Sequence, residues 1–186
     1  AVMMAEHYID DEDEVLILCG DTPLIKGETL KEMTKIKSEG YAAVVMSAVE
    51  DDPTGYGRII RDESNDFMRI REQKDASEEE KAIKEINAGM YIINGKLLKE
   101  NLSKLSVNNA QREYYLTDVL EHIKNAGHRI GVYQADKMEI MGVNSRLQLS
   151  EAERIMRIDV NKMHMANGVT LIDTNSTYID KNVKIG

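Results

Sequence analysis

Apolar residues occur in short runs along the chain, separated by polar and glycine-containing stretches. The run Val15–Cys19 is followed directly by Gly20 and Asp21, which is the pattern of a buried strand that ends at a turn. Residues 42–50 form a second apolar run. Residues 27–40, between the two runs, place apolar side chains three positions apart and end in glycine, which predicts a helix with a glycine C-cap.

Strand and helix patterns continue to alternate through the rest of the chain. Two adjacent segments, 57–62 and 66–76, predict a hairpin. The further elements that the pattern predicts are a strand at 85–94, a helix at 112–127, strands at 129–134 and 138–144, and a long helix at about 145–166. This order is typical of an α/β fold, and we expect a mixed, mostly parallel sheet.

Composition narrows the classes of partner. The chain carries 33 acidic and 24 basic residues, a formal net charge of −9, without a Lys/Arg-rich block, which argues against a nucleic-acid or membrane-surface partner. An acidic protein that handles phosphates needs a cation as intermediary. The single Cys19 excludes an internal disulfide. No signal peptide is visible and no apolar run approaches the roughly 20 residues of a membrane helix, so we predict a cytoplasmic protein.

Five residues that suit ligand binding lie in, directly before or directly after predicted strands. They are Asp21, Gly57, Glu72, Asn87 and Asn144. A parallel sheet gathers the carboxyl ends of its strands at one edge, where ligands bind. We therefore expect these residues to lie close together.

Each of the four side chains also has a structural alternative. Asp21 could cap a turn, and Glu72 could pair with Lys74. Asn87 could close a bulge, and Asn144 could N-cap the long helix. The sequence contains no Walker loop, dinucleotide fingerprint, nucleophile elbow or Cys/His metal cluster. The strand ends are therefore the remaining candidates for chemistry.

Six motifs in order along the chain resemble one bacterial family. They are "LCGDTPLI", "DDPTGYGRII", "REQKDA", "EINAGMYI", "NNAQREYYLTDVL" and "MGVNSRLQLSEAER". Together they resemble the pyrophosphorylase domain of the bifunctional N-acetylglucosamine-1-phosphate uridylyltransferase / glucosamine-1-phosphate N-acetyltransferase. The resemblance covers nearly the whole chain.

The resemblance implies a fold and an activity. The fold is a nucleotide-binding α/β domain at 1–144, a linker helix at 145–167 and, at 168–186, the first coil of a left-handed parallel β-helix that forms a homotrimer. The implied reaction joins UTP and N-acetylglucosamine 1-phosphate to give UDP-N-acetylglucosamine and pyrophosphate, with Mg2+, for peptidoglycan and lipopolysaccharide synthesis and hence cell shape. The β-helix of the family acetylates glucosamine 1-phosphate with acetyl-CoA.

Two alternatives to this function stay open. One is a related nucleotidyltransferase for another sugar 1-phosphate. The other is a non-catalytic fragment that binds nucleotide sugars.

The resemblance also implies roles for single residues. It assigns Mg2+ to Asp21 and to the side-chain oxygen of Asn144. The implied nucleotide-sugar and sugar contacts are, in chain order, Cys19, Gly20, Asp21, Gly57, Glu72, Asn87, Tyr115, Thr117 and Asn144, of which Tyr115 and Thr117 are wall residues.

This chain departs from the family pattern at three positions and lacks one motif. Cys19 stands where the family commonly has Tyr, Ala88 where Thr is common, and Arg112 where Gly is usual. The Gly-rich loop that opens the family's nucleotide domain would precede Ala1. We therefore expect this chain alone to be inactive towards UTP.

Overall fold

The computed structural model describes residues 1–186, which divide into two compact units. The sheet unit comprises Ala1–Cys19 and Lys26–Ile140. The helix unit comprises Gly20–Ile25 and Met141–Gly186. The division of the chain at 144 and 167 stays a prediction.

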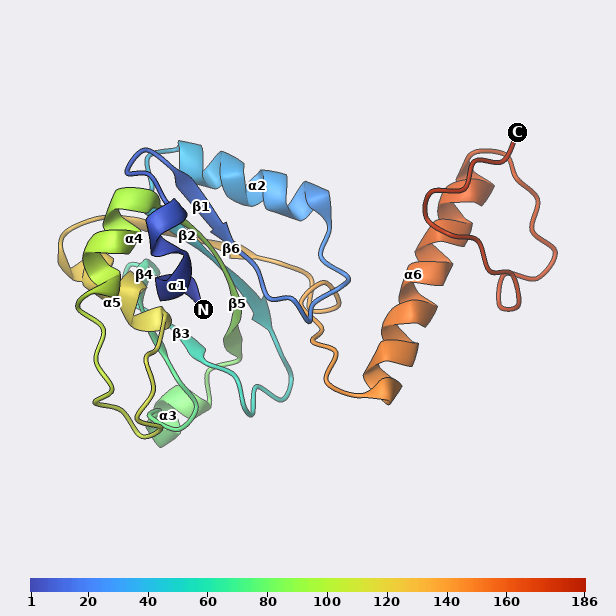
Figure 1. Ribbon diagram of the computed structural model, residues 1–186. Coiled ribbons are helices and arrows are strands. Elements are labelled where there is room, and N and C mark those ends of the chain that lie inside the picture. Colours follow the sequence, from blue (N-terminus) through green and yellow to red (C-terminus); the bar gives the residue numbers. More distant parts are fainter. The chain divides into compact units, whose positions relative to one another are not determined.

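The sheet unit contains all of the strands and every helix except the last (Figure 1). Its elements are α1 (Val2–Ala5), a 3-10 turn (Glu6–Tyr8), β1 (Glu14–Ile17), α2 (Gly27–Ser38), β2 (Ala43–Val49), β3 (Arg58–Arg61), β4 (Phe67–Arg71), α3 (Glu78–Lys81), β5 (Glu85–Asn94), α4 (Gly95–Leu102), α5 (Thr117–Asn125) and β6 (Ile130–Gln134).

The mixed α/β sheet is confirmed, but the prediction of mostly parallel pairing is wrong. The strand order is β4-β3-β5-β2-β6, and β1 also pairs with β5. Only the β2–β6 pair is parallel, and the other pairs are antiparallel. The reason is the position of β5, which lies between β1 and β2 and runs against both of them.

This topology still brings three of the predicted positions, Gly57, Glu72 and Asn87, together in the sheet unit. Strand β5 runs opposite to β2, so it begins where β2 ends, as the pairing of Val49 with Glu85 shows, and Arg58 at the start of β3 pairs with Ile86 there. Asn87 therefore lies near the start of a strand, not at the end of one. Gly57 immediately precedes β3 and Glu72 immediately follows β4, and the pairing of Arg58 with Arg71 holds these two strand ends together.

Helices α4 and α5 cover one face of the sheet. Leu98, Leu102 and Leu120 pack with the sheet side chains of Val45 and Ile93 in one buried cluster. Side chains alternate along β2, so Val44 and Met46, which are also fully buried, point to the opposite face. Helix α2 packs against β2 and β6, and it ends at a glycine in the left-handed conformation, as predicted.

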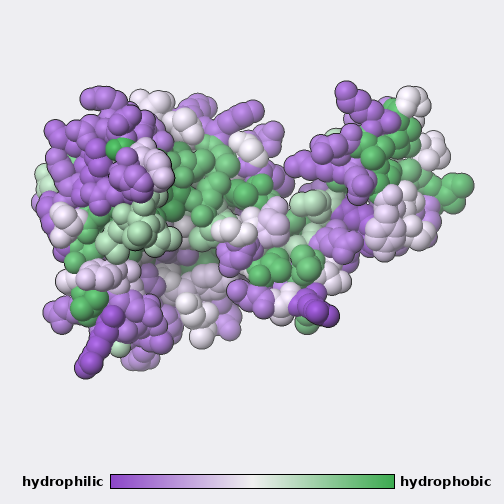
Figure 2. Space-filling model, viewed as in Figure 1, coloured by the Kyte–Doolittle hydropathy of each residue, from purple (hydrophilic) through white to green (hydrophobic).

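Two expectations about strands are wrong. The prediction that β1 is a buried strand is wrong, because Leu16 is 43% exposed and no residue of β1 is fully buried. Figure 2 shows apolar surface on this unit beside polar areas. Residues 138–144 were expected to form a strand, but a turn occupies 137–140, where Asp136 accepts hydrogen bonds from the backbone amides of Met138 and Glu139.

The helix unit is built on α6 (Arg146–Ala166), which confirms the predicted long helix. The buried side chain of Asn161 donates hydrogen bonds to the carbonyl oxygens of Thr174 and Thr177, both at 3.0 Å. These bonds hold the following segment against the helix. Residues 168–186 contain turns and no assigned strand, so the β-helix coil stays a prediction. No helix in either unit combines the length and the apolar character needed to cross a membrane.

Candidate active site

Asp21 and Asn144 meet in the helix unit. The backbone amide of Val143 donates to the carbonyl of Asp21 at 2.8 Å, which holds the two segments side by side. A Cβ placed on Gly142 would lie 3.5 Å from Asp21 Oδ2 and 3.6 Å from Asn144 Nδ2. Both side chains therefore face the same small space beside a residue that has no side chain to fill it.

The structural alternatives for these two residues are wrong. The N-cap of α6 is Ser145, whose hydroxyl accepts the backbone amide of Gln148 at 3.2 Å. The side chain of Asn144 is therefore not used as a cap. Neither Asn144 nor Asp21 makes a side-chain hydrogen bond or ion pair within the protein.

The Asp21 and Asn144 pair fits a divalent cation. It offers one carboxylate and one amide oxygen, and a half-turn of the amide exchanges its oxygen and nitrogen. Magnesium prefers oxygen ligands and takes one or two protein groups together with phosphates and water. The described residues contain no cluster of three or more His, Cys, Asp or Glu side chains that could hold a metal by themselves. Phosphate oxygens would have to complete the coordination at this pair.

A second group of predicted residues meets in the sheet unit. A Cβ on Gly57 would lie 3.3 Å from Glu72 Oε2 and 3.0 Å from Ile70 Cγ2, so a side chain at this position would crowd the carboxylate. Thr117 donates from its hydroxyl to Glu72 Oε1 at 3.1 Å. The backbone amide of Asn87 donates to the carbonyl of Gly57 at 2.8 Å. Glu72 has this threonine as its partner and not Lys74, the ion-pair alternative.

The environment of Glu72 alters its charge behaviour. Burial raises the pKa of the Glu72 carboxyl, and the nearby carboxylates of Asp118 and Asp75 raise it further, while the hydrogen bond from Thr117 opposes the shift. A carboxyl with a raised pKa keeps its proton, and with it an O–H hydrogen-bond donor, to a higher pH than usual. The protonated carboxyl of Glu72 has one hydrogen-bond donor, whereas the carboxylate only accepts.

Asn87 closes a bulge in β5, as its structural alternative predicted. Its Oδ1 accepts the backbone amide of Gly89 at 3.1 Å. Its Nδ2 donates to the hydroxyl of Tyr91 at 2.8 Å. The Cys19 thiol donates to the carbonyl of Gly89 at 3.3 Å, and a Cβ on Gly89 would lie only 2.9 Å from that sulfur. Gly89 also has φ +74°, so glycine is needed here on two grounds.

Tyr115 lies at a small cavity of about 100 Å³ that Glu72 also lines. Its hydroxyl donates to Asp75 Oδ2 at 3.2 Å. Burial raises the pKa of the Tyr115 hydroxyl, and the negative charge of Asp75 adds to the shift. Asp75 also accepts the backbone amide of Ala110 at 2.9 Å, so this carboxylate ties the loop before α5 to the end of β4.

That loop explains why α5 begins at Thr117, five residues later than predicted. Asn109 Oδ1 accepts the backbone amides of Gln111 and Glu113, both at 3.2 Å. Between them Arg112 has φ +55°, the left-handed conformation that favours glycine. The sequence thus places an arginine at a position whose backbone suits the glycine that is usual in the family.

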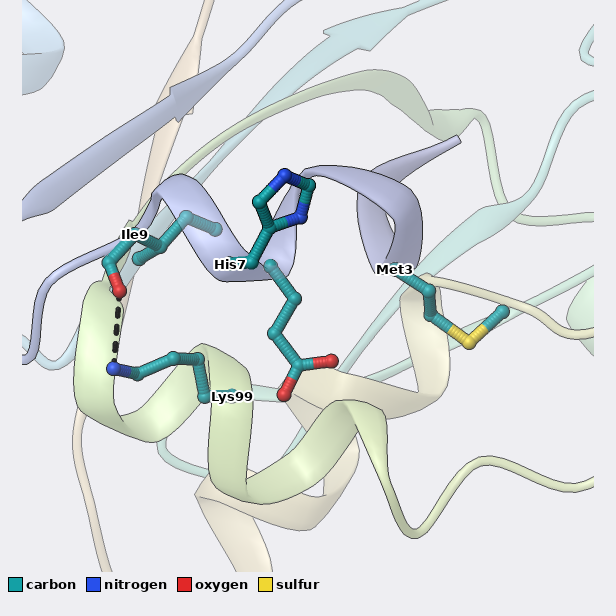
Figure 3. Close-up of a pocket in the computed structure, with 5 residues that line it drawn as sticks. Met3, His7, Ile9 and Lys99 are labelled. Atoms are coloured by element: carbon teal, nitrogen blue, oxygen red, sulfur yellow. Dashed lines mark hydrogen bonds between the residues drawn. The ribbon is translucent and has the colours of Figure 1, made fainter.

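A larger cavity lies elsewhere in the sheet unit (Figure 3). It measures about 430 Å³ and is lined by Met3, Glu6, His7, Ile9 and Lys99. The side-chain amine of Lys99 already has partners in the protein, because it donates a hydrogen bond to the carbonyl of Ile9 at 3.0 Å and forms an ion pair with Asp11. None of the predicted site residues lines this cavity, so we do not assign it to the site.

Tyr91, Gly89 and Asp75 belong to the site geometry but were missed from the sequence. Tyr91 is a core residue by its pattern, and it is indeed 4% exposed. Burial raises the pKa of its hydroxyl, which therefore keeps its proton. The only available signal for Gly89 was a glycine inside a strand pattern, which indicates a bulge or a close approach of another group.

Comparison with known proteins identifies the family. The nucleotidyl transferase family model matches residues 1–139. The chain is 54% identical over 187 residues to the bifunctional protein GlmU of Caldanaerobacter subterraneus subsp. tengcongensis and 54% identical over 188 residues to that of Clostridioides difficile. Each match covers 100% of this chain and 41% of the relative, so the chain spans about two fifths of the length of the curated relatives it matches.

Solved structures give the same fold at low identity. A UDP-glucose pyrophosphorylase from Acinetobacter baumannii matches with a TM-score of 0.63 and 18% identity, over 89% of this chain and 58% of that chain. A protein described as a glucose-1-phosphate thymidylyltransferase, from Bacillus anthracis, matches with a TM-score of 0.60 and 15% identity, over 94% of this chain and 62% of that one. With the family model matching about three quarters of its length, the chain belongs to the nucleotidyl transferase family.

Proposed function

We propose that the protein containing this chain is a uridylyltransferase, which joins UTP and N-acetylglucosamine 1-phosphate to form UDP-N-acetylglucosamine and pyrophosphate. The observation that carries the proposal is the Asp21 and Asn144 pair, two oxygen-bearing side chains that face one space without a partner in the protein. Family membership indicates a divalent metal cofactor, and the substrates come from the resemblance of the six motifs. The relatives' 54% identity over the whole chain supports that resemblance.

The chemistry requires charge neutralisation more than a protein nucleophile. A sugar phosphate must approach the α-phosphorus of UTP, and both molecules are polyanions, so positioning and electrostatic stabilisation dominate the barrier. Asp21 and Asn144 would hold Mg2+. One carboxylate neutralises only half of a divalent charge, and the amide neutralises none of it. The remaining positive charge of the ion would be available to the phosphates.

The sheet-unit residues suit a neutral sugar. Glu72 and Asn87 offer a carboxyl and an amide, which hydrogen-bond hydroxyl and acetamido groups. Gly57 leaves room for the carboxyl of Glu72 beside it, and the hydroxyl of Thr117 orients that carboxyl. Tyr115 forms part of the wall of the cavity beside Glu72. In this proposal the sheet-unit group selects the sugar, and the metal pair binds phosphate.

Cys19 and Gly20 would line the nucleotide-sugar site. The Cys19 thiol is engaged by backbone carbonyls, so a contact made by tyrosine elsewhere in the family would fall to backbone groups here. We extend the proposal to the rest of the parent protein: a linker helix at 145–167, a β-helix beginning at 168–186, acetylation of glucosamine 1-phosphate with acetyl-CoA, a homotrimer, and a cytoplasmic role in cell-wall precursor synthesis.

The test is a pyrophosphate-release assay on the full-length protein that carries this sequence. With UTP and Mg2+, we expect release with N-acetylglucosamine 1-phosphate and much slower release with glucose 1-phosphate or galactose 1-phosphate. Preference for another sugar would replace this function with that of a related nucleotidyltransferase. No release with any of the sugar phosphates would refute the proposed reaction.

A further inference from the structure

Tyr91 and Asn87 lie four residues apart on β5, yet their side chains are in contact. In a regular extended strand, positions this far apart are about 13 Å from each other. The pairing with β2 explains the contact, because Val45 faces Tyr91 and Ser47 faces Asn87, so two steps on β2 span four on β5. The extra residues form the bulge at Gly89, which shortens the path between the two side chains.

The hydrogen bonds decide which way the amide of Asn87 points. A backbone N–H can only donate, so the atom 3.1 Å from the amide nitrogen of Gly89 must be Oδ1. The Nδ2 group then lies 2.8 Å from the hydroxyl oxygen of Tyr91 and gives it one hydrogen. The same hydroxyl lies 3.2 Å from Oδ1, so it touches both ends of the amide. The second hydrogen of Nδ2 has no partner in the protein.

We propose that Tyr91 is a positioning residue that, together with the backbone amide of Gly89, holds the Asn87 amide so that it presents an N–H donor, and not a carbonyl acceptor, to an oxygen of the sugar phosphate. The inference rests on the proposed function and adds to it the direction of one hydrogen bond. Tyr91 itself does not touch the sugar. Its ring belongs to the buried core cluster with Val45 and Ile93, so the core fixes where its hydroxyl lies.

The experiment compares single and double variants of the full-length enzyme. Tyr91→Phe keeps the buried ring and removes only the hydroxyl. A hydrogen bond of this kind contributes about 0.5–1.5 kcal/mol, so we expect the KM for N-acetylglucosamine 1-phosphate to rise about two- to tenfold, with the KM for UTP unchanged. Asn87→Ala should raise the same KM at least as much. Asn87→Asp, which replaces the donor by an acceptor, should raise it as well.

The double variant separates positioning from general loosening of the fold. If Tyr91 acts through Asn87, Tyr91→Phe should add nothing to the KM of Asn87→Ala, because the side chain that it orients is gone. Tyr41→Phe is the matched control: its hydroxyl accepts a hydrogen bond from Arg129 at 2.9 Å, and Tyr41 belongs to neither group of candidate residues. The control should leave both KM values unchanged.

Three results would overturn the inference. An unchanged sugar-phosphate KM in Tyr91→Phe, with a raised KM in Asn87→Ala, would leave the proposed function intact and remove Tyr91 from it. Equal rises for sugar phosphate and UTP would indicate a general structural effect. An unchanged KM in Asn87→Ala would remove the sugar contact itself, and with it the positioning role of Tyr91.

Discussion

Replacement of Arg112 by glycine should stabilise the protein. Arg112 has φ +55°, and the left-handed conformation costs a residue with a Cβ about 1–2 kcal/mol. Glycine removes that strain but adds about 0.4–1 kcal/mol of conformational entropy to the unfolded chain. The balance is a gain of somewhat under 1 kcal/mol, since the strain is the larger of the two. The backbone amides of Gln111 and Glu113, on either side of Arg112, both donate to Asn109 Oδ1, and these hydrogen bonds oppose relaxation of the strain.

The measurement is urea unfolding of the wild type and three variants. Arg112→Gly should raise the free energy of unfolding, whereas Arg112→Ala should not, because alanine keeps the strain and loses only the guanidinium. Asn65→Gly is the matched control, since Asn65 has φ +66° and asparagine tolerates this conformation better than most residues. Stabilisation by Arg112→Ala equal to that by Arg112→Gly would refute the reasoning, because the gain would then come from removing a charge and not from the backbone.

Two further substitutions test the sheet-unit group. Gly89→Ala should lower the free energy of unfolding by about 1–3 kcal/mol, because φ is unfavourable for alanine and the new Cβ would lie 2.9 Å from Cys19 Sγ. Gly127→Ala is the control, since Gly127 has φ +89° but open space around it, and it should cost less. Equal losses in urea unfolding would contradict the close contact at Gly89. Glu72→Gln should make the protein less sensitive to pH. Folding raises the pKa of the Glu72 carboxyl above its ordinary value of 4.5. Well below pH 4.5 the carboxyl is protonated in both the folded and the unfolded state and does not affect the free energy of unfolding. As the pH rises from 4.5 through the raised pKa, the free energy of unfolding falls, because the unfolded state loses this proton more readily. Thermal unfolding from pH 4 to pH 8 measures this loss, and an identical pH dependence in the variant would contradict it.

Local patterns predicted the elements that depend on nearby residues. The glycine after α2, the β3–β4 hairpin and the long helix α6 each have their signal within a few residues, and the structure has all three. Strand pairing depends on which distant segment lies alongside, and the position of β5 between β1 and β2 is not encoded in the pattern of β5 itself. The prediction of mostly parallel pairing was wrong for this reason.

The candidate site was predicted to a similar degree. Asp21 and Asn144 were singled out by their places after apolar runs, and the structure brings them to one space. The same holds for Gly57, Glu72 and Asn87. Tyr91 could not be found in this way, because the glycine inside the strand pattern indicates a bulge but does not say which two side chains the bulge brings together. The roles of the candidate site residues in catalysis stay predictions.

Isothermal titration of UDP-N-acetylglucosamine into the full-length protein, with and without Mg2+, tests the central claim most directly. The claim is that the carboxylate at position 21 helps to hold the cation that binds the phosphates. We expect a Mg2+-dependent heat of binding in the wild type and in the control variant Asp159→Ala. Asp159 is an exposed carboxylate of the same helix unit that has no hydrogen-bond or ion-pair partner. That heat should be lost in Asp21→Ala. An undiminished Mg2+-dependent heat in Asp21→Ala would contradict the account.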